Sequence, residues 1–166
     1  MVIPICLPDI SKTLSTSLTE SGGSEAVKTL FAIIIILLCG IFSNRFGKKL
    51  FLVSGYYLIA LGSLLASISN NYISLLISIM IMGVGSGSAI ALINPLVIDL
   101  HPKNSVKFLN ITNAFYPIGI MLSAILFGEL LTIGISRQSI FKIVALITFT
   151  LGISLNTKKF PPTAGH

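Results

Sequence analysis

Charged residues are scarce in this sequence. Of its 166 residues only 10% are charged and five are acidic, whereas 54% are hydrophobic, and the mean hydropathy is +0.97. Soluble domains carry about a quarter charged residues, so a water-soluble globule is excluded. So few carboxylates could not keep a surface around this much Ile, Leu and Val in solution. We therefore expect the chain to lie in a lipid bilayer.

Residues that serve catalysis or metal binding are equally rare. Cys6 and Cys39 lack metal-site spacing, and no cluster of His, Cys, Asp and Glu with metal-ligand spacing can be assembled around His101 or His166. No nucleophile motif accompanies the serines. The Lys and Arg residues are spread in small groups between apolar stretches, as in membrane loops rather than nucleic-acid interfaces. The sequence predicts no enzyme, no cofactor, no metal and no nucleic-acid partner.

Long uncharged runs predict the membrane-spanning segments. Residues 50–98 carry no charge, and one helix of that length would be roughly 74 Å long against a hydrocarbon core of about 30 Å. The run must fold back, and the polar break at Ser69, Asn70 and Asn71 suits a turn. The predicted spans are residues 26–43, 50–68, 72–98, 108–128 and 140–155. Lys28 and Lys142 interrupt the first and last span near an end, where they are expected to snorkel to the headgroups.

The predicted fold class is an all-α, multi-pass transmembrane bundle of about five spans. Residues 1–25 are interpreted as the end of a truncated first helix followed by an extracytoplasmic polar loop, with a native extramembrane tail as the alternative. Residues 26–155 form the predicted bundle and residues 156–166 a short cytoplasmic tail. One side of this topology holds seven of the Lys and Arg residues and the other four, so the positive-inside rule places the loop at residues 44–49 and the C-terminus in the cytoplasm of a cell-membrane protein.

That loop carries a motif. Residues 40–49 fit the pattern G-x-x-x-[DN]-R-x-G-[RK]-[RK], through Gly40, Asn44, Arg45, Gly47, Lys48 and Lys49. The segment resembles the signature loop between the second and third helices of the major facilitator superfamily. Its glycines permit a sharp turn, and Arg45 is expected to pair with Asp99 at a neighbouring helix end. A generic basic loop is the alternative, and Asn44 replaces the family's usual aspartate.

A second stretch resembles the fourth and fifth helices of the fucose permease-like branch of that superfamily. It comprises residues 83–87, Asn94 with Pro95, residues 99–102 and residues 113–119. The resemblance implies an N-terminal six-helix half of a sugar/proton symporter, which would need a C-terminal half or self-association. Gly83, Gly85 and Gly87 are expected to be helix-packing residues, because small residues let neighbouring backbones approach in lipid.

Polar residues at membrane depth are the candidate site. Asn94, Asn113 and Tyr116 are predicted to bind the substrate, since amides and a phenol can hydrogen-bond sugar hydroxyls; interhelical hydrogen bonding is the alternative. The acids that the resembling branch uses for proton coupling are absent, with Ile90 at one of their positions. The predicted function is transport of a small solute, with sugar favoured, by alternating access. A non-transporting remnant or membrane assembly subunit remains the rival.

Overall fold

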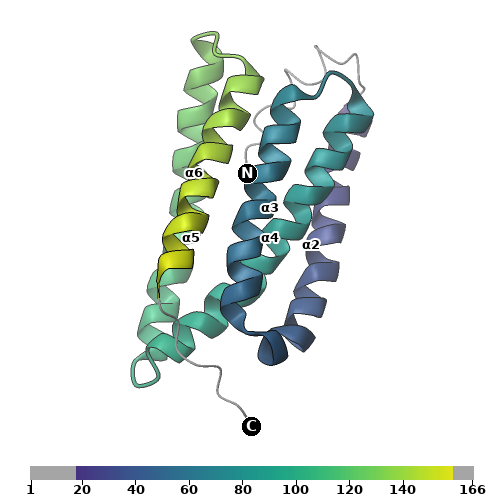
Figure 1. The fold of residues 1–166 in the computed structure, drawn as a ribbon. Helices are drawn as coiled ribbons and strands as arrows, with labels where there is room; N and C mark the ends of the chain where they lie inside the picture. Colours follow the sequence, from purple (N-terminus) through teal and green to yellow (C-terminus); the bar gives the residue numbers. More distant parts are fainter. Residues whose placement is uncertain (1–17, 159–166) are drawn as a thin grey trace.

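The computed structural model describes the backbone of residues 18–158, in which every regular element is an α-helix. The helices are α2 (Leu18–Phe46), α3 (Lys48–Ile68), α4 (Tyr72–Leu100), α5 (Ser105–Thr132) and α6 (Arg137–Thr157). Consecutive helices run antiparallel in one bundle (Figure 1). All five are long and apolar enough to cross a membrane. The prediction of an all-α bundle of about five spans is confirmed.

The first helix begins earlier than the sequence indicates. α2 starts at Leu18, so Gly23 and Ser24 are helical, and the prediction of a polar loop at these positions is wrong. A run of small polar residues resembles a loop locally, but here it extends the apolar helix that follows it, because tertiary context overrides local propensity. The predicted end of a truncated first helix falls before Leu18, outside the described residues. At the other end, α6 continues to Thr157.

Two short connections fix where α3 begins and ends. Gly47 is the one residue between α2 and α3, with a positive φ of 93°, a conformation that costs glycine little because it has no Cβ. At the other connection, Asn71 caps α4 by accepting a 2.8 Å hydrogen bond from the backbone N–H of Ser74. The predicted turn at residues 69–71 is therefore present.

Glycines of α4 bring three helix backbones together. A Cβ on Gly83 would lie 2.6 Å from the Lys28 carbonyl oxygen of α2, and one on Gly87 would lie 2.5 Å from that of Ala32. Gly85, two residues from each, faces α3 instead, where a Cβ would lie 2.5 Å from the Gly55 carbonyl oxygen. Alternate glycines thus seat α4 between α2 and α3.

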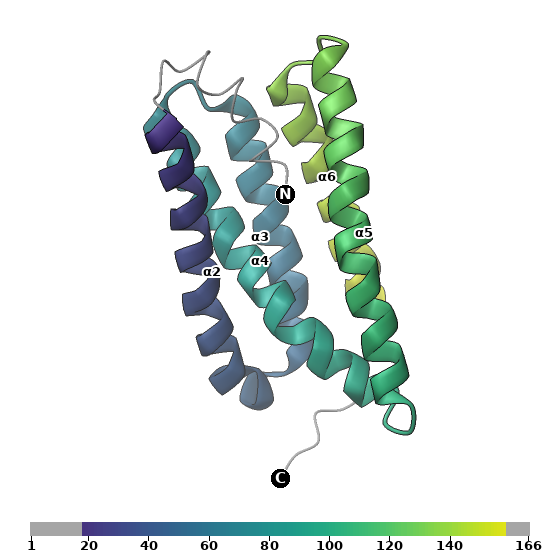
Figure 2. The same cartoon turned by 180° about the vertical axis from the view of Figure 1, so that it is seen from behind.

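The remaining two helices attach differently. α6 packs against α3, whereas α5 lies at the edge of the bundle beside α6, and Phe127 is its one buried residue (Figure 2). The C-terminal part of α4 swings toward α5 (Figure 2); Pro95, which cannot donate a helical hydrogen bond, lies in that part. A buried cluster joins α3, α4, α5 and α6, and it consists of Ala66, Leu75, Ile79, Met82, Phe127, Ile140 and Phe141.

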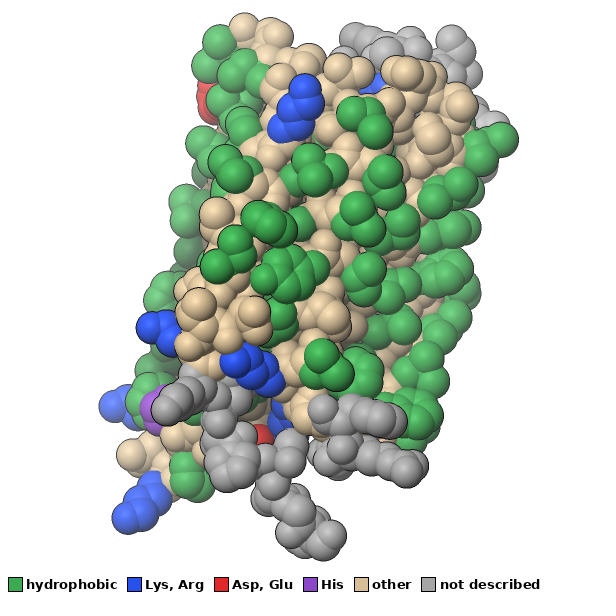
Figure 3. All heavy atoms as spheres, in the orientation of Figure 1, with side chains coloured by type: hydrophobic (Ala, Val, Ile, Leu, Met, Phe, Trp, Pro, Cys, Tyr) green, Lys and Arg blue, Asp and Glu red, His purple; other side chains and the backbone are tan. Residues whose placement is uncertain are grey.

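The outer surface suits lipid. Hydrophobic side chains cover the height of the face seen in Figure 3, and its Lys and Arg side chains lie toward the two ends. Many large apolar residues are exposed, among them Leu37, Ile73 and Phe115, which are 65 to 70% exposed. A bilayer would cover such a surface at no hydrophobic cost.

Candidate functional site

A cavity of about 530 Å³ lies within the bundle and is the main candidate site. All five described helices contribute to its wall. The wall is mostly apolar, with Ala32, Ile36, Ile59 and Val144 among its residues. Its polar members are Glu25, Lys28 and Thr29 of α2, Tyr56 and Ser63 of α3, Ser86 of α4, Tyr116 of α5 and Thr148 of α6. A mostly apolar cavity with a few polar groups is typical of a small-molecule site.

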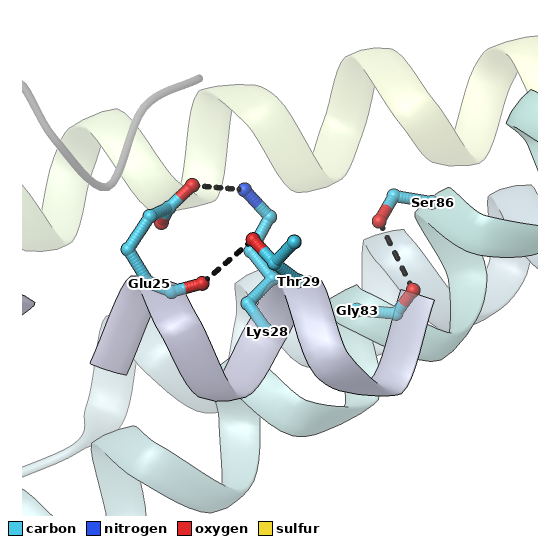
Figure 4. A network of polar contacts seen from close by, with 5 residues as sticks. All are labelled: Glu25, Lys28, Thr29, Gly83 and Ser86. Atoms are coloured by element: carbon cyan, nitrogen blue, oxygen red, sulfur yellow. Dashed lines mark hydrogen bonds and ion pairs between the residues drawn. The ribbon is translucent and has the colours of Figure 1, made fainter. Parts of the chain in front are cut away.

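An ion pair lies in the cavity wall. Lys28 Nζ donates to Glu25 Oε1 at 2.8 Å, and the two side chains are 18% and 29% exposed. Both extend from α2 toward α6, as Figure 4 shows. Within the described part of the chain, Glu25 Oε2 is shielded from solvent and accepts no hydrogen bond. The pair therefore offers one unused acceptor inside the bundle.

The hydroxyl groups of the wall donate mainly to their own helices. Thr29 Oγ1 donates to the Glu25 carbonyl at 2.9 Å and Ser86 Oγ to the Gly83 carbonyl at 3.0 Å (Figure 4). Thr148 Oγ1 likewise donates to the Val144 carbonyl at 2.8 Å. A hydroxyl whose hydrogen is engaged in this way still offers oxygen lone pairs. These residues can accept hydrogen bonds from a bound molecule.

The three residues predicted from sequence are dispersed. Tyr116 lines the cavity although it is 60% exposed. Asn113, one turn earlier on α5, is exposed and is not among the lining residues. Asn94 is partly buried outside that lining, and within the described part of the chain its Oδ1 is shielded from solvent without a hydrogen-bond partner. The structure thus brings one of the three to the cavity.

Glu25 and Lys28 were missed by the sequence-based analysis. Glu25 was assigned to a loop and Lys28 to the headgroup region, but both side chains line the cavity and pair with each other. An acid one turn earlier thus supplies an ion-pair partner for Lys28, and its predicted snorkelling to the headgroups stays a prediction. An acid and a lysine three residues apart share one face of a helix, and that spacing was the available signal. Ile90, which stands where the resembling branch has an acid, also lines the cavity.

A second polar cluster lies at the opposite end of α2. Lys48 Nζ contacts Asp99 Oδ2 at 2.6 Å, which ties the start of α3 to the end of α4. Lys49 Nζ donates to the carbonyls of Asn156 and Lys158 at 2.6 and 2.8 Å, and a cation is favourable at that helix terminus. The side chains of Asn44 and Arg45 lie outside the described residues, so the predicted pairing of Arg45 with Asp99 stays a prediction.

Comparison with known proteins identifies the family. The family model for the Major Facilitator Superfamily matches residues 1–165. MFS transporter L2 of a Phoma species is 30% identical over 60% of this chain and 17% of its own length. The bacillibactin exporter of Bacillus subtilis is 30% identical over 64% of this chain and 28% of its own. The hexuronate transporter of Bacillus subtilis is 27% identical over 87% of this chain and 34% of its own.

The chain thus spans between about a sixth and a third of the length of these curated relatives. The family match covers nearly every residue, and the five apolar helices fit half of that family's fold. This sequence belongs to the Major Facilitator Superfamily of multi-pass membrane proteins.

Proposed function

We propose that the chain forms one half of a secondary transporter and moves a small solute by alternating access around the cavity. The observation that carries the proposal is the cavity itself, about 530 Å³ in volume and bounded by helices from both sides of the bundle. In transporters with repeated halves, solute sites lie near the bilayer midplane where the halves meet. The relatives' names, an exporter of bacillibactin and a transporter of hexuronate, support a transported solute.

We further propose a sugar as the solute, with Tyr116 and Asn113 among its contacts. Tyr116, whose side chain carries an aromatic ring and a hydroxyl, lines the cavity, and an aromatic ring can cover the apolar face of a sugar. Asn113 and Tyr116 lie one turn apart on α5, and both are exposed. That exposure leaves them available to a second half packed on this side. Asn94 would join the site only if that second half extends it.

Transport assays in proteoliposomes test the proposal. The 166-residue chain alone should show no saturable uptake of neutral sugars such as L-fucose, because the rocking partner is absent. Joined to a cognate C-terminal half, it should recover uptake. Asn113→Ala in the completed protein should impair uptake while leaving membrane insertion unchanged.

Asn70→Ala is the matched control, since Asn70 is an exposed amide in the turn between α3 and α4. Proton-driven saturable uptake by the chain alone would contradict the half-transporter proposal. A completed protein that inserts but transports none of the solutes tested would favour the non-transporting assembly subunit. Full activity of Asn113→Ala would leave the fold standing and remove that residue from the site.

A further inference from the structure

The pairing of Glu25 with Lys28 in the cavity wall points to a solute class. We propose that these two side chains form a subsite that selects a neutral, polyhydroxylated solute over a charged one of the same size. The inference rests on the transport function proposed above and deepens it. Its basis is the charge balance of the pair, its unused hydrogen-bonding groups, and the hydroxyl groups around it.

Charge balance disfavours ionic solutes. The ammonium and the carboxylate are 2.8 Å apart, and within the described residues they are the two formally charged side chains that line the cavity. An anionic solute bound to Lys28 would lie beside the like-charged Glu25 carboxylate, and a cationic one bound to Glu25 would lie beside the like-charged Lys28 ammonium. Either arrangement adds a charge that no opposite charge balances in a mostly apolar wall, which is costly. A neutral solute leaves the pair intact.

The pair still has hydrogen-bonding capacity. In the described part of the chain Lys28 Nζ bonds Glu25 alone, so two of its three donors are unused. Glu25 Oε2 is shielded and accepts nothing there. An unused donor beside an unused acceptor complements two neighbouring hydroxyls, one of which accepts from Lys28 while the other donates to Glu25. Hydrogen bonds to charged groups are the stronger ones, so this match would orient the solute.

The hydroxyls of the wall favour the same class. Thr29, Ser86 and Thr148 donate their hydrogens to helix carbonyls, and Ser63 donates to the sulfur of Met82 at 3.4 Å. What these groups present to the cavity is oxygen lone pairs. A solute that carries several O–H donors can use them, whereas a carboxylate has only acceptors to offer. Among the described lining residues, the other titratable groups are the phenols of Tyr56 and Tyr116.

Competition among three sugars that share the same ring but differ in charge tests the inference. Glucose is neutral, glucuronate is an anion and glucosamine is a cation at neutral pH. Vesicles from cells that express the gene's full product should take up glucose with a higher kcat/KM than either charged relative. Glu25→Gln leaves Lys28 unpaired and should shift the ratio toward glucuronate by on the order of tenfold, about 1.4 kcal/mol.

Lys28→Gln should shift the preference toward glucosamine by a similar factor. The double variant Glu25→Gln with Lys28→Gln restores neutrality with an amide donor and acceptor at each position, so the preference for glucose should return. Lys142→Gln is the matched control, because Lys142 is exposed on α6 and is not a lining residue. It removes the same charge and should leave all three ratios unchanged.

Three outcomes separate the two proposals. A wild-type preference for glucuronate or glucosamine would overturn the inference and leave transport standing. Unchanged ratios in Glu25→Gln and in Lys28→Gln would also overturn it. If the single variants fail to insert because of their unpaired charge, the wild-type ratio and the double variant decide in the same way. Absence of saturable uptake of every solute by inserted wild-type protein would overturn the transport function and the inference together.

Discussion

Among single residues, Lys48 and Asp99 form a contact whose contribution to the free energy of unfolding can be measured. The two groups are 2.6 Å apart and 19% and 31% exposed, so water and salt weaken their attraction. Pairs of this kind contribute about 0.2 to 1 kcal/mol. We expect Asp99→Asn to lower the free energy of unfolding in detergent by an amount in that range. A double-mutant cycle with Lys48→Gln measures the coupling directly.

Glu129→Gln is the control, since Glu129 is an exposed acid near the end of α5. It should change stability by less than Asp99→Asn, and raising the salt concentration should shrink the difference. Zero coupling between Lys48 and Asp99 at low salt would show that their proximity adds nothing to stability.

Sequence reasoning reached the candidate site only in part. Tyr116 was found because it lies one turn from Asn113 on one face of a predicted span, where polar groups are conspicuous. The pair of Glu25 and Lys28 was missed because its meaning depends on where α2 begins and on which helices pack against it. Tertiary packing decides whether a lysine near a span end reaches water or an acid inside the bundle. Packing likewise gives Asp99 a partner in Lys48 that the sequence did not indicate.

At the scale of helices, the glycines of α4 set how closely the helices pack. Gly87→Ala places a methyl group 2.5 Å from the Ala32 carbonyl oxygen, a backbone atom that cannot rotate away. The two helices must separate, at a cost of about 1 to 3 kcal/mol. We expect a lower midpoint of thermal unfolding in detergent and weaker cross-linking between α2 and α4.

Gly119→Ala supplies the matched control on α5. Nothing lies within 4 Å of a Cβ built on Gly119, so the same substitution should be neutral or should stabilise the helix by up to about 1 kcal/mol. Equal destabilisation by both changes would show that the contact with α2 does not account for the effect at Gly87.

Helix number was predictable from sequence, and helix limits were less so. Bilayer thickness sets the length of a spanning helix, and residues 50–98 are too long for one span, so the run has to fold back. The limits depend on local caps. Asn71 was recognisable as a turn residue, whereas the start of α2 at Leu18 lies in a polar stretch that carries no apolar signal.

For the whole molecule, the orientation in the membrane is the first quantity to measure. The distribution of Lys and Arg predicts that the α2–α3 and α4–α5 connections face the cytoplasm. In a background in which Cys6 and Cys39 are replaced, Phe46→Cys and Asn104→Cys should resist an impermeant thiol reagent in intact cells. Asn70→Cys should react.

Permeabilised cells are the control, and all three positions should then react. Asn70 and Asn104 are exposed, so resistance in intact cells reports the membrane barrier rather than burial. Reaction of both Phe46→Cys and Asn104→Cys from outside would reverse the orientation and move the Lys48 and Asp99 contact to the cell exterior.

α5 is held to the bundle differently from α2, α3 and α4. α2, α3 and α4 are held by direct backbone contact and by a one-residue connection, whereas α5 has one buried residue along its length. Within the described residues, α5 is therefore the cavity wall with the least burial, and α2, α3 and α4 pack as one unit. Among the described helices, a displacement of α5 would leave the glycine contacts of α4 unstrained, whereas a displacement of α2 or α3 would break them. The lack of side chains at the glycines of α4 thus joins α2, α3 and α4 into one unit and leaves α5 outside it.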